Sequence, residues 1–343
     1  MTNREIFSNQ LNHIETPVLP YTITFDGDVG ERLTEHYGSS DWTKRIQIFL
    51  EGSWCVGSTN RIPIDDMYER DLYGGIWRKD CRPTHLETPP LSQPNFDGYE
   101  FPKAEVFFDH ERKEADRIVC TNDTENFRLG FIICGLFECC WQLRGFENSL
   151  MDAVEEPDFF QEMVDRLTDL YLQFTDYMCE LPLDGIFFCD DWGDQQGVII
   201  GADRWRKFFK PAWAKIYERA RASGKRIISH CCGSVVDIMP DLIEIGLDCL
   251  ESCQPEARGM NPYELKKRYG DKMTFWGGLG SQRLLPFGTP ESIRAEIAHM
   301  RKEMYRGGGY IMAPAKALQP ETPTANAVAI VEALTELNDA SKW

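Results

Sequence analysis

The sequence predicts an α/β protein built as a single (β/α)₈ TIM barrel over residues 1–343, with an N-terminal extension and a proline-rich excursion. Three observations predict this class. Short apolar runs alternate with helical patterns from Leu129 onward, which indicates a parallel sheet. Several of these runs end in clustered His, Cys or Asp, as barrel strands do at an active site. No dinucleotide-binding glycine pattern follows any run, which favours a closed barrel over an open sheet.

The predicted strands are short apolar runs bounded by turn residues. The first is Pro17–Phe25, which the turn sequence Asp26-Gly27-Asp28 ends. The others lie at 130–135, 184–190, 225–231, 247–253, 273–277 and 309–313. Their regular spacing leaves room for a helix between most neighbours, as parallel pairing requires.

Three segments between or after these strands have the pattern of helices. Apolar residues recur at helix spacing from Trp205 to Ala220, and a second helix is expected to begin at Thr289-Pro290-Glu291 and to end before Gly307. A last helix is expected after Thr322-Pro323. Residues 80–103 hold five prolines and little periodicity, so we expect a surface excursion that forms a lid or a homodimer contact.

Composition excludes several classes of partner. The formal net charge is −18 and is spread along the chain, so neither nucleic acid nor an anionic membrane is an expected partner. The first residues are polar and no apolar run approaches the ~20 residues of a membrane span, which predicts a cytoplasmic protein. Twelve cysteines, including adjacent pairs, then suit small core residues better than disulfides.

The run Ile227–Gly233 carries the strongest chemical signal, because a β-branched strand leads directly into His230 and Cys232. An imidazole nitrogen and a thiolate from one strand end can bind one zinc ion, and a catalytic zinc needs a third protein ligand. Cys253 ends the next strand and is the first candidate. Cys189, Asp190 and Glu138 are alternatives. In the competing interpretation, His230 bonds a backbone carbonyl and the cysteines only pack.

Other strand ends supply candidates for acid–base chemistry and binding. Asp190 and Asp191 are adjacent carboxylates that point in different directions, so one can act as general acid or base, although a helix cap or turn explains them equally well. Trp276 precedes two glycines and could stack on a flat ligand or pack in the core. Lys316 follows a predicted strand and could pair with Asp190, Asp191 or a substrate carboxylate, or lie in solvent.

At these residues the chain resembles the uroporphyrinogen decarboxylase superfamily from about residue 130 to the end. The segments that carry the resemblance are Leu143–Glu147, Asp190-Asp191-Trp192-Gly193-x-Gln195, His230–Gly233, Gln254-Pro255, Phe275–Gly278 and Gly308–Ile311. The resemblance implies a single (β/α)₈ barrel. It also implies one of two chemistries: cofactor-free decarboxylation of a tetrapyrrole, or zinc-dependent methyl transfer with a corrinoid protein.

The second chemistry fits this sequence better. The decarboxylases carry an N-terminal Arg-rich signature that is missing here, whereas the methyltransferases use a His-x-Cys pair that His230 and Cys232 match. The later cysteine ligand of the methyltransferases has no counterpart, since the loop at 315–317 holds Lys316 and no Cys or His. The resemblance therefore implies either that Cys253, Glu138 or one of Asp190 and Asp191 completes a zinc site, or that zinc is absent.

We thus expect a methyl donor:corrinoid protein methyltransferase, of the O-demethylase type, acting on a small methylated substrate. Zinc would activate the heteroatom that bears the methyl group, and Asp191 or Tyr310 would supply a proton to it. The expected substrate-binding residues are Trp192, Gln195, Gln254 and Trp276.

Two alternatives remain open from the sequence. A metal-independent decarboxylase or lyase would use Asp190 or Asp191 as acid and Lys316 to hold a small carboxylated substrate. A barrel without catalytic activity would only bind a ligand or the corrinoid protein.

Overall fold

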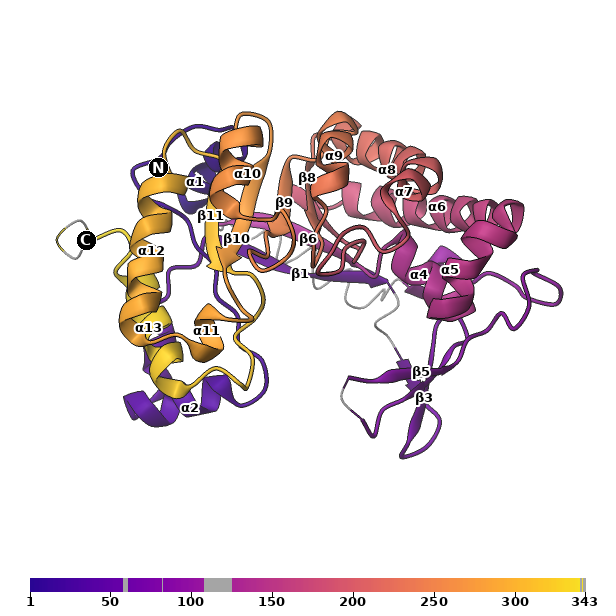
Figure 1. The fold of residues 1–343 in the computed structure, drawn as a ribbon, viewed down its shortest axis with the longest axis horizontal. Coiled ribbons are helices and arrows are strands. Elements are labelled where there is room, and N and C mark those ends of the chain that lie inside the picture. The colour runs from indigo at the N-terminus through magenta and orange to yellow at the C-terminus, as the bar shows by residue number, and fades with distance from the viewer. Residues whose placement is uncertain (58–60, 82, 108–124, 340, 342–343) are drawn as a thin grey trace.

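The computed structural model describes residues 1–57, 61–81, 83–107, 125–339 and 341. Seven parallel strands form one curled sheet in which the spatial order equals the chain order. They are β1 (Leu50–Gly57), β6 (Phe127–Ile133), β7 (Gly185–Cys189), β8 (Arg226–His230), β9 (Cys249–Ser252), β10 (Thr274–Leu279) and β11 (Tyr310–Pro314). Helices lie outside the sheet (Figure 1). The predicted α/β barrel class is confirmed.

The predicted first strand at 17–25 lies beside β11 but forms no regular strand. Two isolated parallel bridges join Tyr21 to Met312 and Phe25 to Leu318. Pro17 and Pro20 have no N–H, so a continuous ladder is impossible over this segment. The ring of Tyr21 packs against Phe49, which precedes β1. Residues 17–25 thus lie at the eighth position, between β11 and β1.

Helices follow the strands along the chain, as the alternating pattern predicts. They are α1 (Asn3–Leu11), α2 (Val29–Tyr37), α4 (Leu136–Arg144), α5 (Phe146–Glu155), α6 (Pro157–Cys179), α7 (Ala202–Phe208), α8 (Lys210–Ala222), α9 (Met239–Glu244), α10 (Pro262–Tyr269), α11 (Leu284–Phe287), α12 (Pro290–Met304) and α13 (Thr324–Thr335), with short 3₁₀ turns at Ser40–Arg45, Ala104–Phe107 and Val236–Ile238. The helical pattern around Trp205 is divided into α7 and α8 at Phe209, and Pro211 lies in the first turn of α8. The expected starts of α12 and α13 are confirmed to within two residues.

A second, antiparallel sheet was not expected from the sequence. It comprises β2 (Arg61–Pro63), β3 (Tyr68–Asp71), β4 (Ile76–Arg78) and β5 (His85–Thr88). The start of the proline-rich excursion at 80–103 therefore belongs to this small sheet. Beyond it, Leu91 N–H donates to Leu143 O at 2.9 Å, so the chain lies against the end of α4. Figure 1 shows the small sheet projecting from the barrel below α4 and α5. A lid or dimer role for 80–103 stays a prediction.

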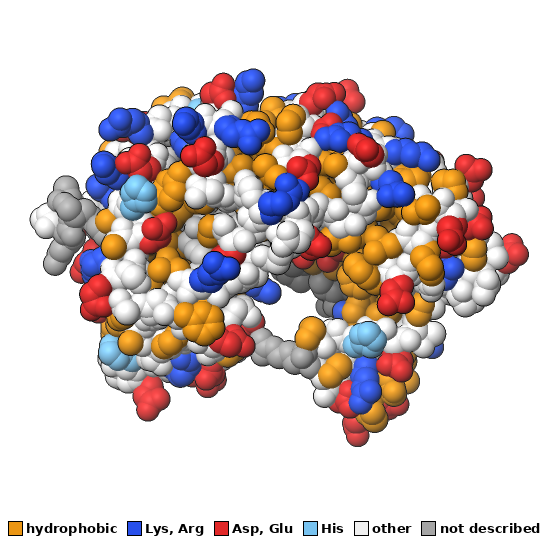
Figure 2. Space-filling view, in the orientation of Figure 1, with side chains coloured by type: hydrophobic (Ala, Val, Ile, Leu, Met, Phe, Trp, Pro, Cys, Tyr) orange, Lys and Arg blue, Asp and Glu red, His pale blue; other side chains and the backbone are white. Residues whose placement is uncertain are grey.

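The distribution of charged side chains over the surface and the burial of the central strands agree with the composition. Figure 2 shows acidic and basic side chains scattered over one face, which is hollowed between the small sheet and the region of α2 and α13. All residues of β10 and β11 are buried. Among the described residues, no helix is both long enough and apolar enough to cross a membrane. The ten described cysteines are free thiols.

Gly277 allows β10 to lie close against β9. Its φ is +117°, and a Cβ placed on it would lie 1.9 Å from the carbonyl oxygen of Ser252. We expect Gly277→Ala to lower the free energy of unfolding by roughly 3 kcal/mol, because backbone strain and a clash add together. Gly307→Ala is the matched control, since its φ is also positive (+78°) but nothing lies within 4 Å of the added Cβ. Equal stability of the two variants in urea denaturation would show that the close approach costs nothing.

Candidate metal centre

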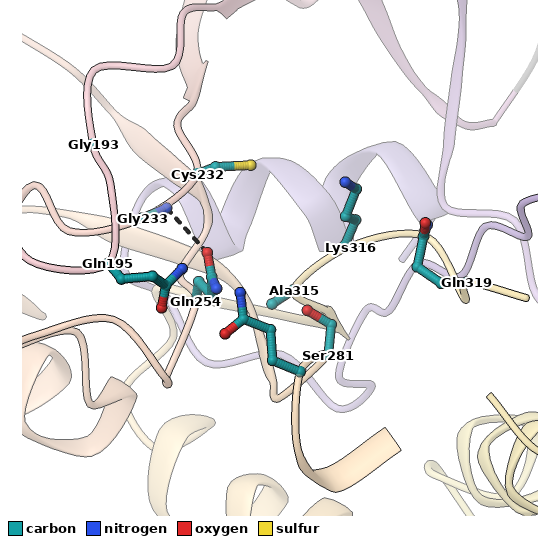
Figure 3. A pocket seen from close by; sticks show the side chains of 10 residues that line it. Gly193, Gln195, Cys232, Gly233, Gln254, Ser281, Ala315, Lys316 and Gln319 are labelled. Atoms are coloured by element: carbon teal, nitrogen blue, oxygen red, sulfur yellow. Dashed lines mark hydrogen bonds between the residues drawn. The ribbon is translucent and has the colours of Figure 1, made fainter. Parts of the chain in front are cut away.

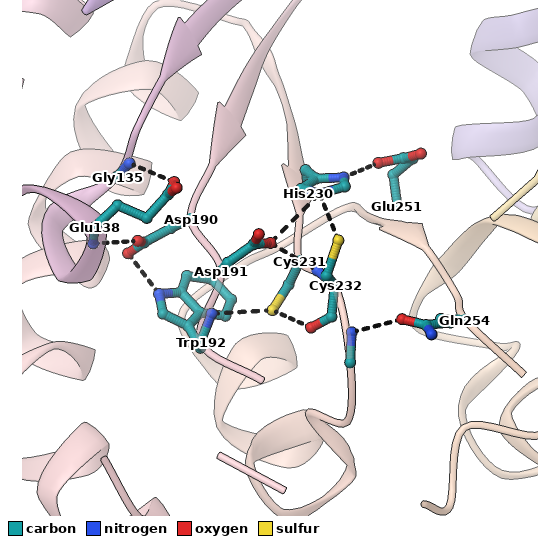
Figure 4. A network of polar contacts seen from close by, with 11 residues as sticks. Gly135, Glu138, Asp190, Asp191, Trp192, His230, Cys231, Cys232, Glu251 and Gln254 are labelled. Carbon is teal, nitrogen blue, oxygen red and sulfur yellow. Dashed lines mark hydrogen bonds and ion pairs between the residues drawn. The ribbon is translucent and has the colours of Figure 1, made fainter. Parts of the chain in front are cut away.

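Three side chains with metal-binding atoms meet where β7 and β8 end. The Nε2 atom of His230 lies 3.3 Å from Sγ of Cys232 and 3.4 Å from Oδ1 of Asp191. All three donor atoms lie within 4.8 Å of one another. Figure 4 shows the three side chains converging from two neighbouring strand ends. Such a mixed nitrogen, sulfur and oxygen set suits zinc.

Strand register explains why these residues meet. Cys189 of β7 lies opposite His230 of β8 in the parallel ladder. Two residues further along each strand lie Asp191 and Cys232, so the alternation of side chains brings them to the same side. The backbone N–H of Cys232 donates to Oδ1 of Asp191 at 2.9 Å, which fixes the carboxylate beside the thiol.

Glu251 of β9 orients the imidazole from the other side. Its Oε2 atom is hydrogen-bonded to Nδ1 of His230, which leaves Nε2 directed toward Cys232 and Asp191. Burial alone lowers the pKa of His230, but the Glu251 charge and the contacts with Asp191 and Cys232 outweigh it and hold this pKa well above its usual value. Because Nε2 binds a metal only without its proton, metal uptake here is expected to release a proton.

Glu251→Gln tests the orienting role of this carboxylate. We expect the affinity for zinc to fall by about 10–100-fold, because the neutral amide holds the imidazole less firmly and makes its nitrogen less basic. The check is competition with a chelator of known affinity, monitored as zinc release. Glu256→Gln, on the loop after β9, is the control. An unchanged zinc affinity in Glu251→Gln would contradict the orienting role.

Asp191 is the carboxylate of the pair that suits a metal. Burial would raise its pKa, but the hydrogen bond and charge of His230 and the N–H of Cys232 lower it below the usual value. Asp191 is therefore ionised over the whole neutral range and can bind a cation. The sequence had offered either carboxylate of the pair, and the structure brings only Asp191 into the donor group.

Asp190 faces the opposite way and caps α4. Its carboxylate accepts hydrogen bonds from the N–H groups of Phe137 (3.1 Å) and Glu138 (3.0 Å) and from Nε1 of Trp192 (2.6 Å). It is fully buried, and burial raises its pKa to about 7. The cap interpretation thus describes Asp190, and its side chain does not reach the donor group.

Glu138 lies in the first turn of α4, close enough for the charges of both carboxylates to act on it. Burial and the charges of Asp190 and Asp191 raise its pKa well above the usual value. One of its oxygens lies 3.4 Å from the N–H of Gly135. These effects favour the protonated form of Glu138, and its side chain lines the same cavity as Asp191.

The structure does not bring Cys253 or Tyr310 to the donor group. Cys253 is fully buried; burial and the charge of Glu251 raise its pKa to about 12. Tyr310 begins β11, and its hydroxyl donates to the carbonyl of Gly277 at 2.9 Å and lies 3.6 Å from the sulfur of Met300 on α12. Its side chain thus lies between the sheet and α12. As the first residue of its strand, Tyr310 is also far from the carboxyl end of the barrel, where the donor group lies. Cys189 flanks His230 without joining the group.

Three cavities lie around the site: the first and third are lined by members of the donor group, and the second by Glu251. The first, of ≈ 350 Å³, is polar and is lined by Cys232, Gln195, Gln254 and Lys316 among others (Figure 3). The second, of ≈ 210 Å³, lies at the barrel mouth between Trp276, Glu251 and Lys316. The third, of ≈ 400 Å³, contains Asp191 and Glu138 and opens toward the small sheet.

The predicted binding residues divide among these places. Gln195 lines the polar cavity, and Gln254 both lines it and accepts from the N–H of Gly233 at 3.0 Å. Trp276 lines the barrel mouth and donates to Thr22 at 2.9 Å. Trp192 is buried under the cluster against Trp205 and supports Asp190. The sequence-based prediction did not include Glu251. Its position two residues before Cys253, on a strand that neighbours β8, could have indicated that it lies near His230.

Fold and site together define an α/β barrel with a candidate metal centre at its mouth. A family model described as uroporphyrinogen decarboxylase (URO-D) matches residues 114–337. The chain belongs to this family, whose similar relatives are enzymes, as the sequence motifs had indicated.

Known proteins from both branches of the family are similar to this chain. A methylcobamide:CoM methyltransferase from Methanosarcina barkeri is 25% identical over 184 residues, which cover 54% of this chain and 51% of the relative. A uroporphyrinogen decarboxylase from Coxiella burnetii is 22% identical over 183 residues, which cover 52% and 48%. The chain thus spans about half the length of the curated relatives it matches. The solved structure of a methyltransferase from Methanosarcina mazei has the same fold, with a TM-score of 0.71 and 19% identity over 98% of this chain and 99% of that one.

Proposed function

We propose that this protein transfers a methyl group between a small methylated substrate and a corrinoid carried by a partner protein. The observation that carries the proposal is the convergence of His230, Cys232 and Asp191 at adjacent strand ends. Metal-independent decarboxylation needs no such donor group. The similarity to a methylcobamide:CoM methyltransferase supports the same chemistry.

The donor group fits zinc as the resident metal. His230 Nε2, Cys232 Sγ and Asp191 Oδ1 would hold the ion as three protein ligands and leave one position open, which is the arrangement of catalytic zinc sites. Asp191 takes the place of the missing later cysteine. Bound zinc would supply Lewis acidity to the heteroatom that carries the methyl group.

The surrounding residues orient the ligands and manage the proton. Glu251 fixes the imidazole, and the N–H of Cys232 fixes Asp191. When the methyl group moves to the corrinoid, the bonding electron pair stays on the heteroatom, which then takes a proton. Burial favours the protonated form of Glu138, which lines the same cavity as Asp191, so we assign it this transfer in place of Asp191 or Tyr310.

Two separate cavities, one lined by Cys232 and the other by Asp191, suit two reactants. The polar cavity on the Cys232 side carries Gln195, Gln254 and Lys316, which provide hydrogen bonds for an amide-rich corrinoid rim. The cavity on the Asp191 side then remains for the methyl donor. An O-demethylase, in which the donor is a methyl ether, is the form of the reaction that we propose.

A spectroscopic assay tests this function. Zinc-loaded protein would be mixed with free cob(I)alamin and with 1,2-dimethoxybenzene, methanol or dimethyl sulfide as donor, and the reverse reaction would start from methylcobalamin with a thiol. We expect methylation or demethylation of the cobalamin in at least one direction, and none with His230→Ala. Absence of transfer in both directions by zinc-bound protein would contradict the proposal, and carbon dioxide release from a carboxylated substrate would favour the decarboxylase.

A further inference from the structure

We propose that the cavity between the small sheet and α4–α5 binds an uncharged aromatic methyl donor, whose ring lies against Trp77 and Trp141 and whose methylated heteroatom points to Asp191. This inference rests on the proposed function and names the substrate class of the same site.

The walls of this cavity are largely aromatic and aliphatic. Trp77 and Leu86 are opposite residues on β4 and β5, so both side chains lie on the same face of the small sheet. Facing them, α4 contributes Trp141 and α5 begins with Phe146. The ring centroids of Trp77 and Trp141 lie 6.2 Å apart, and those of Trp141 and Phe146 lie 6.5 Å apart. These edge-to-face contacts are the geometry in which a further aromatic ring adds favourably.

Size and rigidity fit a single substituted ring. The cavity measures ≈ 400 Å³, whereas an apolar cavity of ~150 Å³ already binds benzene. The indole of Trp77 is buried, and its Nε1 donates to Asp71 at 2.6 Å. Asp71 also accepts from the N–H of Gly75 at 2.8 Å, so the wall is fixed before a ligand binds.

Charge determines which ring is accepted. Among the described residues, those that line the cavity include His85 but no Lys or Arg, and they include the carboxyl groups of Glu138 and Asp191. The Arg61 guanidinium lies 3.9 Å from the centre of the Trp77 ring, but it is already paired with Glu69 at 2.7 Å. A carboxylate or sulfonate placed here would therefore lose its hydration without gaining an unpaired Lys or Arg among these residues. The polar cavity differs, because Lys316 lines it. An anionic donor is therefore disfavoured in the aromatic cavity, and a neutral one is favoured.

The position of the two carboxyl groups gives the bound ring a direction. Asp191 is both a member of the donor group and part of the cavity wall. Phe146 begins α5, beyond the end of α4 whose first turn holds Glu138, and 47% of its surface is exposed. A ring that enters past Phe146 and packs against Trp141 therefore presents its far substituent to Asp191 and Glu138, where the methyl group would be removed.

Binding measurements test the assignment without turnover. Isothermal titration of the full chain with 1,2-dimethoxybenzene would be compared with 3,4-dimethoxybenzoate, its anionic analogue. We expect the neutral ring to bind at least about tenfold more tightly than the benzoate. Trp141→Ala is expected to weaken the neutral ring about tenfold and Phe146→Ala about threefold. Phe287→Ala removes a phenyl ring that is 83% exposed on α11 and is the matched control.

A variant with an added charge distinguishes a specific change in binding from a loss of folding. Leu86→Lys places a cation on the cavity wall, and it should reverse the preference in favour of the benzoate while circular dichroism stays unchanged. Equal binding of the two rings by wild type, or undiminished binding of the neutral ring by folded Trp141→Ala, would overturn the inference. Binding of the neutral ring without any methyl transfer would support the cavity assignment and contradict the proposed function, so the two failures are distinct.

Discussion

Purified His230→Ala and Cys232→Ala are each expected to contain less than about a tenth of a zinc per chain, against about one in wild type. Each variant removes one of the three side chains that we propose as zinc ligands, and the two remaining ligands would bind the ion too weakly to retain it during purification. Methyl transfer should fall by at least about a thousandfold in both, because the heteroatom is then no longer activated. Elemental analysis after preparation without chelators measures the first effect, and the cobalamin assay measures the second.

Two matched variants make this result specific. Asp191→Asn should lower zinc content as the other ligand variants do, whereas Cys253→Ala should leave it unchanged, because Cys253 lies outside the donor group. Zinc retained by Asp191→Asn and lost by Cys253→Ala would instead make Cys253 the third ligand. Fewer than about a tenth of a zinc ion per chain in the wild-type protein would contradict the metal mechanism.

Asp190→Ala is expected to destabilise the protein by about 4 kcal/mol. The variant leaves three donors without an acceptor, namely the N–H groups of Phe137 and Glu138 and Nε1 of Trp192, and each orphaned buried group costs ~1–3 kcal/mol. The amino terminus of α4 also loses the negative charge of the ionised fraction of Asp190, whose pKa is raised to about 7. The thermal midpoint should fall by roughly 8 °C or more.

The control for this variant is a second aspartate with a similar bonding pattern on the surface. Asp194 accepts from the N–H groups of Gln196 and Gly197 but is exposed. Asp194→Ala should change stability by less than about 1 kcal/mol, since water replaces the lost acceptor. A thermal midpoint for Asp190→Ala within about 2 °C of wild type would show that the cap is dispensable.

Much of the barrel could be predicted because parallel strands buried on both faces appear as short apolar runs. β7 to β11 all lie within the predicted ranges or within two residues of them. β1 and the small sheet could not be found in this way. Their strands include charged residues such as Glu69 and Arg70, and several are only three or four residues long. Pairing with neighbours, and not local pattern, holds these segments extended.

Site residues that lie close together in the sequence could be predicted. Those that are brought together by the alignment of neighbouring strands could not. His230 and Cys232 lie two residues apart at one strand end, and the sequence identified them. The choice of Asp191 over Asp190 depends on the alignment of Cys189 with His230 across two strands. Glu251 comes from a third strand, while Tyr310 lies at the wrong end of its own. Such facts depend on the alignment of whole strands, which no single segment encodes.

The isolated bridges at residues 17–25 have a consequence for how the protein folds. The sheet order from β1 to β11 follows the chain, so each new strand can add to its predecessor through local contacts. Closure is different, because Tyr21 must meet Met312 from almost the other end of the chain. Contacts of such long sequence separation form late, since they carry a large loop-closure entropy. During synthesis the side of residues 17–25 that faces β11 therefore stays open until β11 has been made, and a chaperone would have its longest opportunity to bind there.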